Sequence, residues 1–149
     1  MKIALKDKSF DPFTEIRDFQ AAMNADGRFG AAAFFIGSMR DLNENEKVIS
    51  MELEHYPGMT EKHLYDIAAR ANEKWPLIDA LILHRVGVVN IADPIVVVAV
   101  WSAHRAAAFD ACRFIMEDLK SKAPFWKKET TVAGERWVEK NTPGFTDIR

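Results

Sequence analysis

The sequence predicts an α+β fold: a single domain with a mixed or antiparallel sheet and flanking helices. Its 149 residues, 48% of them hydrophobic, suffice for one domain with a sizeable core, and no Gly/Ser-rich linker divides residues 1–149. Segments with helical periodicity alternate with short apolar segments typical of strands. One alternating segment and several tight turns favour a mixed sheet rather than a purely parallel one.

The first predicted elements are a helix and a strand. Asp11 precedes Pro12, which is the arrangement of an N-cap followed by proline at the first helical position. Apolar residues then recur at roughly helical spacing over residues 13–23. The apolar segment 30–37 predicts a buried strand, and the polar segment 38–46 predicts a loop.

The alternating segment 48–56 predicts a half-buried strand. The residues expected on one face are Ile49, Met51, Leu53 and His55. Pro57 belongs to the turn that follows, and Thr60 is the expected cap of a second helix. Pro76 ends that helix, because proline disfavours helical geometry in the residue before it.

The second half of the chain predicts two strands, a helix and a closing strand pair. The strands are expected at 81–86 and 95–101, and the second is apolar on both faces, as a central strand should be. A helix is expected over residues 106–119 and is stopped by Pro124. The segment 130–139 predicts a short pair of strands.

Composition excludes several classes of protein. A net charge of −2 and a pI near 6.1 disfavour a general nucleic-acid binder. The single cysteine, Cys112, excludes an internal disulfide, lies on the apolar stripe of its helix and fits a reducing compartment. The N-terminal residues lack the apolar region of a signal peptide, and the longest strongly apolar run, 95–101, is too short to span a bilayer. We therefore expect a cytoplasmic protein.

The four histidines predict no metal site. Their spacing is not that of metal ligands, and no cysteine pair accompanies them. His84 lies in the middle of a strand and is expected to be a core histidine. His104 differs, because it precedes the helix 106–119 together with Arg105. Helix N-termini attract anions, and the Arg105 guanidinium suits phosphate or carboxylate; alternatively, Arg105 pairs with Asp110 and His104 only caps the turn.

Cations are concentrated between residues 104 and 128, a segment that contains six Lys/Arg and only three Asp/Glu. Ion pairs along the helix explain part of this excess. Lys127 and Lys128 follow Pro124 and two aromatic residues, which are expected to hold the segment against the core and so fix both lysines in place. Arg40 follows a strand, a position from which it could contact a ligand; alternatively, it is simply a solvent-exposed arginine on a loop. The residues alone indicate a cationic site for an anionic ligand.

Five segments, in order and with similar spacing, resemble the large, catalytic subunit of molybdopterin synthase. They are residues 54–61 (EHYPGMTE), 102–105 (SAHR), 114–116 (FIM), 119–129 (LKSKAPFWKKE) and 134–138 (GERWV). The resemblance covers residues 34–139. It implies an α/β-hammerhead variety of the α+β fold, with no metal and no organic cofactor.

The resemblance also implies a function and partners. Such an enzyme transfers sulfur from the C-terminal Gly-Gly thiocarboxylate of a small ubiquitin-like carrier to cyclic pyranopterin monophosphate. The product is molybdopterin, whose dithiolene receives the sulfur. Two large subunits form a homodimer, with one carrier at each far end, so that the complex is a heterotetramer.

Carried over residue by residue, the resemblance implies a catalytic pair and a set of binding residues. Lys120 is expected to contact the thiocarboxylate, and Lys127 to orient the substrate beside it. The expected substrate-binding residues are Ser38, Met39, Arg40, His104, Arg105, Lys128 and Glu129. Relatives often carry a basic residue and valine at positions 38 and 39, and some carry arginine where this chain has Asn141.

Two other classes of function remain as alternatives. A non-catalytic scaffold would bind the tail of a ubiquitin-like partner without turnover, although such a module has no need of Lys120 and Lys127. An unrelated enzyme that binds a phosphoanion is the second alternative. An assay for molybdopterin with the thiocarboxylated carrier and the pterin precursor separates all three.

Overall fold

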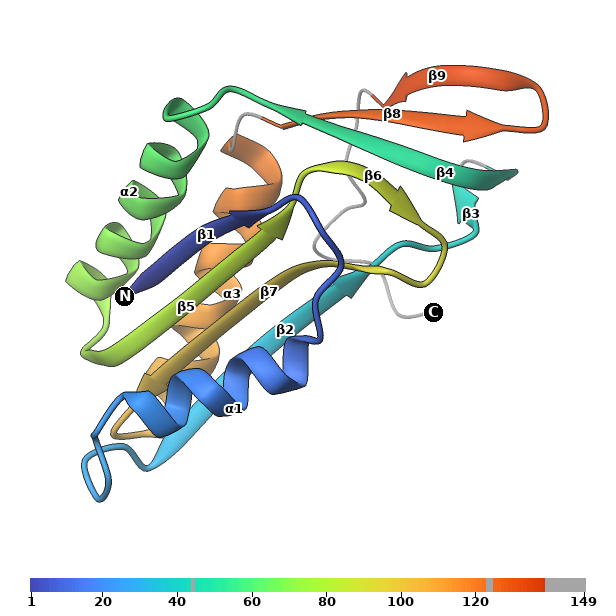
Figure 1. Cartoon of the computed structure of the whole chain (residues 1–149). Coiled ribbons are helices and arrows are strands. Elements are labelled where there is room, and N and C mark those ends of the chain that lie inside the picture. The colour runs from blue at the N-terminus through green and yellow to red at the C-terminus, as the bar shows by residue number, and fades with distance from the viewer. Residues whose placement is uncertain (44, 123–124, 139–149) are drawn as a thin grey trace, which may run out of the picture.

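The structure is a computed structural model that describes residues 1–43, 45–122 and 125–138 (Figure 1). Its first sheet contains β1 (Lys2–Lys6), β5 (Leu77–Arg85), β7 (Pro94–Ser102) and β2 (Ala31–Ser38), in that order across the sheet. β1 pairs with β5 in parallel, whereas the pairs β5–β7 and β7–β2 are antiparallel. The predicted mixed sheet is therefore confirmed.

Three helices cover the two faces of this sheet (Figure 1). α2 (Met59–Lys74) and α3 (Arg105–Lys122) lie on one face, and α1 (Pro12–Ala22) lies on the other. In β7 the side chains of Val96, Val98 and Val100 pack on the α2–α3 side, and the residues between them pack on the α1 side. Burial on both faces confirms β7 as a central strand.

A second, antiparallel sheet lies across one end of the first (Figure 1). It contains β3 (Leu42–Asn43), β4 (Glu46–His55), β8 (Phe125–Thr131) and β9 (Gly134–Val138) in this order, and β6 (Gly87–Asn90) also pairs with β4. The chain enters this sheet where β2 and β5 end and again where α3 ends. The junction between the two sheets therefore gathers residues that lie far apart in the sequence.

Several local predictions hold. The Asp11 carboxylate accepts hydrogen bonds from the backbone N–H groups of Phe13 and Thr14, and Pro12 is the first helical residue. Cys112 is buried, and burial raises the pKa of its thiol to about 11, as expected for an inert core cysteine. Within the described residues, no helix has the length and apolar character needed to cross a membrane.

The strand predictions need two corrections. β2 is an edge strand and not a buried one, and Phe34 and Phe35 are 50% and 42% exposed. In β4 the predicted alternation fails at Ile49, which is 49% exposed, whereas Val48 is 2% exposed. The register with β8 shifts between Val48 and Ser50, and such a β-bulge moves the following side chains to the other face.

Helix boundaries and short strands also differ from the predictions. α2 begins at Met59, and the Thr60 hydroxyl accepts from the backbone N–H of Tyr56 instead of capping the helix. The segment after α3 forms strand β8 directly from Phe125 onward, whereas the strand pair was predicted from residue 130. Pro124, the predicted helix stop, and Asn141 lie outside the described residues.

Candidate active site

A pair of lysines lies where α3 meets the second sheet. Lys120 comes from the last turn of α3, and Lys127 comes from β8. Their side chains interact with each other through a hydrogen bond. The tertiary structure thus joins the two lysines that the family resemblance implies as catalytic.

The lysine pair lines a polar pocket of about 130 Å³. The pocket is lined by Ser38, Met39, Arg40, Leu42, Asn43, Val48, Met51, Ile95, Lys120, Lys127, Glu129 and Val138. Six of the nine residues expected at the site therefore come together here.

Met39 is buried, and its backbone is held by the turn before β7. Its N–H donates to the Asp93 carbonyl, and its carbonyl accepts from the backbone N–H of Ala92. This anchoring fixes the segment that carries Arg40.

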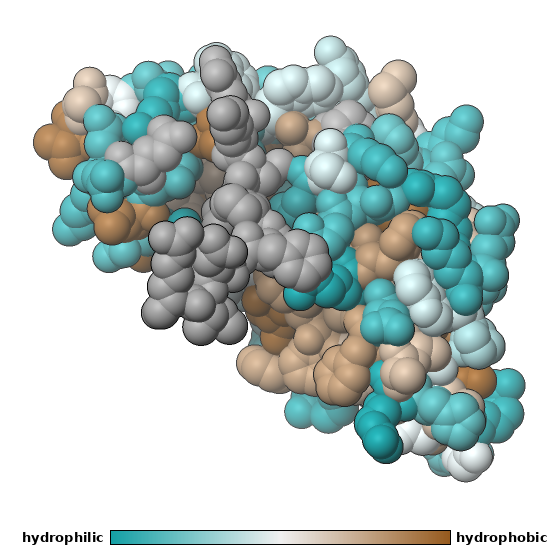
Figure 2. All heavy atoms as spheres, turned by 180° about the vertical axis from the view of Figure 1, so that it is seen from behind, coloured by the Kyte–Doolittle hydropathy of each residue, from teal (hydrophilic) through white to brown (hydrophobic). Residues whose placement is uncertain are grey.

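Lys120 also lines a second hollow, an apolar groove of about 670 Å³ between β2 and α3. The groove is lined by Ala33, Phe34, Phe35, Phe109, Asp110, Cys112, Arg113, Met116, Glu117 and Lys120. Figure 2 shows a band of apolar side chains, bordered by polar ones, on the face behind the sheet. Lys120 therefore stands where an apolar groove meets a polar pocket.

The structure does not bring His104 and Arg105 into this pocket. Both are exposed at the start of α3, and Lys120 lies fifteen residues further along the helix. At a rise of 1.5 Å per residue, the two ends are separated by about 22 Å. Within one chain, the expected contact of His104 and Arg105 with the same substrate as Lys120 is therefore not made.

Lys128 also lies outside the pocket, because successive side chains of a strand point to opposite faces. Its Nζ is 3.6 Å from Glu135 Oε2 and 5.3 Å from the centre of the Trp137 ring. Lys128 is therefore not among the residues that line the pocket, and its contact with the substrate stays a prediction. Lys127 and Glu129, which precede and follow it, line the pocket.

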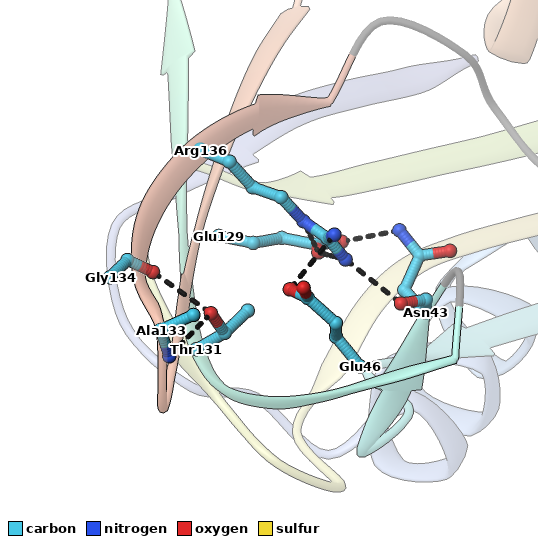
Figure 3. A network of polar contacts seen from close by, with 7 residues as sticks. All are labelled: Asn43, Glu46, Glu129, Thr131, Ala133, Gly134 and Arg136. Atoms are coloured by element: carbon cyan, nitrogen blue, oxygen red, sulfur yellow. Dashed lines mark hydrogen bonds and ion pairs between the residues drawn. The ribbon is translucent and has the colours of Figure 1, made fainter.

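Glu129 is held by residues that the sequence did not single out (Figure 3). Its side chain is buried, and its Oε1 accepts a hydrogen bond of 2.8 Å from Asn43 Nδ2. The Arg136 guanidinium is 3.2 Å from Glu129 Oε2 and 3.0 Å from Glu46 Oε2. Asn43 and Glu129 are 86 positions apart, and no local pattern signals such a contact.

His84 is a further neighbour of the lysine pair. It is fully buried, stacks on Phe125 at a centroid distance of 3.8 Å, and places Nδ1 2.7 Å from the Arg85 carbonyl oxygen. Burial, followed by the charges of Lys120 and Lys127, lowers the pKa of His84 to about 3 against the opposing effect of that carbonyl. His84 is therefore a neutral core histidine, as predicted, and it packs against the first residue of β8.

Burial lowers the pKa of both lysines. The pKa of Lys127 falls to about 8, first through burial and then through the positive charge of Lys120, while Glu129 acts in the opposite direction. Burial is also the main cause that lowers the pKa of Lys120. Lys127 therefore releases its proton more readily than an ordinary lysine, and its neutral amine becomes accessible just above neutral pH.

We expect Lys127→Met to stabilise the fold at pH 7 by about 2 kcal/mol. Below pH 8 the native state holds a buried ammonium that the unfolded chain keeps in water. Between pH 8 and 10.5 the unfolded chain binds more protons than the native one, so wild-type stability rises with pH and the advantage of methionine fades. Urea unfolding at pH 7 and pH 10 measures this difference. Lys128→Met is the control without such a gain, and destabilisation by Lys127→Met at pH 7 contradicts the interpretation.

The described residues contain no group of three or more His, Cys, Asp or Glu side chains that could hold a metal ion.

The fold and the site define a class of protein: an α+β protein in which a lysine pair lies between an apolar groove and a polar pocket. Such an arrangement suits chemistry on anions, because fixed cations stabilise charge in a water-poor site.

Comparisons with known proteins identify the family. A family model described as MoaE protein matches residues 9–122. The molybdopterin synthase catalytic subunit of Ralstonia nicotianae is 53% identical over 92% of this chain and 76% of its own length, and that of Pseudomonas aeruginosa is 50% identical over 93% and 91%. The chain belongs to the MoaE protein family.

Solved structures agree with this assignment. The molybdopterin biosynthesis MoaE protein of Burkholderia ambifaria superposes with a TM-score of 0.77 at 48% identity, covering 92% of this chain and 88% of the other. Molybdopterin synthase of Staphylococcus aureus gives a TM-score of 0.79 at 33% identity, covering 92% and 95%. The α+β fold predicted from the sequence is that of these relatives.

Proposed function

We propose that this chain is the catalytic subunit of a molybdopterin synthase, a sulfurtransferase of molybdenum cofactor biosynthesis. It transfers sulfur from the C-terminal thiocarboxylate of a small ubiquitin-like carrier to cyclic pyranopterin monophosphate and so forms the dithiolene of molybdopterin. Membership of the MoaE family supports this function, since relatives at 53% and 50% identity carry that name. The observation that carries the proposal is the position of Lys120 and Lys127 at the junction of groove and pocket.

The two hollows suit the two substrates. The apolar groove beside edge strand β2 has room for the extended tail of the carrier, and Lys120 is one of its lining residues. The polar pocket, with Arg40 and Lys127 among its lining residues, takes an anionic part of the pterin precursor. The thiocarboxylate and the precursor then meet at the lysine pair, where opposite charge holds both.

The lysine pair supplies the charge and the proton acceptor that the transfer needs. The thiocarboxylate sulfur forms a bond to a pterin carbon while a carbon–oxygen bond at that carbon breaks, and the oxygen leaves as water or stays on the phosphate group. Water then cleaves the bond between that sulfur and the acyl carbon of the carrier. The carrier leaves as a carboxylate, and the sulfur stays on the pterin. In our assignment the Lys120 ammonium neutralises the thiocarboxylate, and the Lys127 amine, with a pKa of about 8, accepts the proton of the attacking water.

The proposal includes a homodimer in which His104 and Arg105 serve the site of the partner protomer. These two residues lie about 22 Å from Lys120 along their own helix, which leaves a second copy as the way to bring them to the precursor. Each carrier binds one catalytic subunit, so the complex is a heterotetramer. A cytoplasmic location belongs to the proposal as well, in keeping with the single cysteine of the chain.

Reconstitution tests the function. The purified chain is mixed with a thiocarboxylated carrier and cyclic pyranopterin monophosphate, and molybdopterin is measured. We expect product to form only when all three components are present, and the same carrier ending in a carboxylate gives none. Carrier binding without product would favour the non-catalytic scaffold, and the absence of both would contradict the proposal.

A further inference from the structure

We propose that Arg136 is a positioning residue of the sulfur-transfer site: by holding the Glu129 carboxylate between itself and Asn43, it sets the charge carried by the lysine pair. The consequence for catalysis rests on the proposed function, whereas the effect on the lysines does not. Arg136 lies on β9, outside the set of residues that line the pocket. Its influence therefore passes through Glu129.

One guanidinium joins four strands of the second sheet (Figure 3). Arg136 Nη2 and Nε lie 3.2 Å and 3.4 Å from Glu129 Oε2 on β8. The same Nη2 donates to the Asn43 carbonyl oxygen of β3 at 2.8 Å, and Nη1 pairs with Glu46 Oε2 of β4 at 3.0 Å. Asn43 Nδ2 completes the arrangement by donating to Glu129 Oε1. Both carboxylate oxygens thus have partners on the side of Asn43 and Arg136.

The guanidinium compensates for the burial of a carboxylate. Glu129 is 5% exposed, and a carboxylate at such a position needs a cation or several hydrogen-bond donors to replace the water that it has lost. Arginine remains charged at every relevant pH and offers a planar fork of donors. The carboxylate of Glu129 is thus held in place, with Lys127 two residues before it on the same face of β8.

Charged groups on several elements around the pocket influence the protonation of Lys127. Lys120 of α3 disfavours its protonation, and Glu129 favours it. His84 of β5 is neutral, and Arg40 also lines the pocket. Because Arg136 holds Glu129, the carboxylate offsets only part of the lowering, and the pKa of Lys127 stays at about 8.

Removing the clamp should change this balance in a defined direction. In Arg136→Gln, the pocket lysines are the cations that remain beside Glu129, so the carboxylate turns toward Lys127 and favours its ammonium form. In Glu129→Gln, the negative charge is absent and the amine form is favoured. The two substitutions therefore shift the titration of Lys127 in opposite directions, which general damage to the fold does not do.

The experiment measures the titration of Lys127 without carrier or precursor, by competitive acetylation across pH with fragment-level mass spectrometry. Lys128, outside the pocket, serves as the internal reference. We expect Arg136→Gln to move the midpoint about one pH unit upward and Glu129→Gln to move it downward. The double variant should match Glu129→Gln, because Arg136 acts through Glu129. Glu46→Gln, which removes only an exposed partner of Arg136, should leave the midpoint unchanged.

A midpoint that Arg136→Gln leaves unmoved, or moves downward, overturns the proposal. Thermal melts establish that each variant is folded. If Arg136→Gln is not, Arg136→Lys, which retains the charge but not the fork, takes its place: a smaller upward shift supports the proposal, and no shift or a downward one overturns it. The pH profile of molybdopterin formation then tests the catalytic consequence, and its midpoint should follow the titration. If no product forms with the wild type, the proposed function fails while the titration result stands.

Discussion

Replacing Lys120 by alanine is expected to lower molybdopterin formation by about 10³-fold or more, while the carrier still binds. Lys120 is the residue that lines both the apolar groove and the polar pocket, so it is placed to touch both reactants. Alanine removes the ammonium beside the thiocarboxylate but leaves the apolar walls of the groove in place. Single-turnover assays with pre-formed complex measure the chemical step, and titration of the labelled carrier measures binding.

Lys122→Ala is the matched control for this substitution. Lys122 belongs to the same last turn of α3, but it is exposed and pairs with Asp118 at 3.5 Å. Exposed pairs contribute little to stability, and Lys122 lines neither hollow, so its loss should leave turnover near the wild-type rate. Near-normal turnover by Lys120→Ala would refute the catalytic assignment. Loss of carrier binding would instead show that Lys120 contributes to binding of the carrier.

The second large effect concerns complementation between protomers. Arg105→Ala and Lys120→Ala should each be nearly inactive alone, because each removes one cation from every site. If Arg105 serves the site of the partner protomer, a dimer with one copy of each variant has one intact site and one doubly damaged site. Random exchange makes half of all dimers mixed, so roughly a quarter of wild-type activity should return on mixing.

The control for complementation uses two residues of one pocket. Lys120→Ala and Lys127→Ala damage the same pocket of their own chain, so their mixed dimers contain no intact site and should stay inactive. Differently tagged copies and native mass spectrometry establish that exchange has occurred. No recovery with the Arg105 pair after proven exchange would exclude a contribution across the dimer, and full activity of Arg105→Ala alone would exclude any role.

Much of the fold and part of the site could be predicted from the sequence because they depend on local chemistry. An aspartate followed by proline specifies the start of α1 through groups two or three residues away. A run of apolar residues without alternation specifies a strand buried on both faces, and β7 is such a strand. Lys120 and Lys127 could be named because they belong to a long segment that resembles a known family.

The edges and registers of strands could not be predicted in the same way. β2 is as apolar as a buried strand, yet it lies at a sheet edge and exposes Phe34 and Phe35 toward the groove. Ile49 continues a perfect alternation, yet a bulge against β8 turns it outward. An apolar pattern reports that a side chain seeks burial, but the partner strand decides which face is buried.

By itself the sequence determined the kinds of element, the central strand, the core histidine His84 and the concentration of cations near the end of α3. Only the tertiary structure decided that Lys127 faces the pocket and Lys128 does not, and that His104 and Arg105 lie at the far end of a helix. It alone joined Glu129 to Asn43 across 86 residues. The physical reason is range: caps and periodicity act within a few residues, whereas pairing, burial and buried charge depend on groups that meet only when the chain is folded.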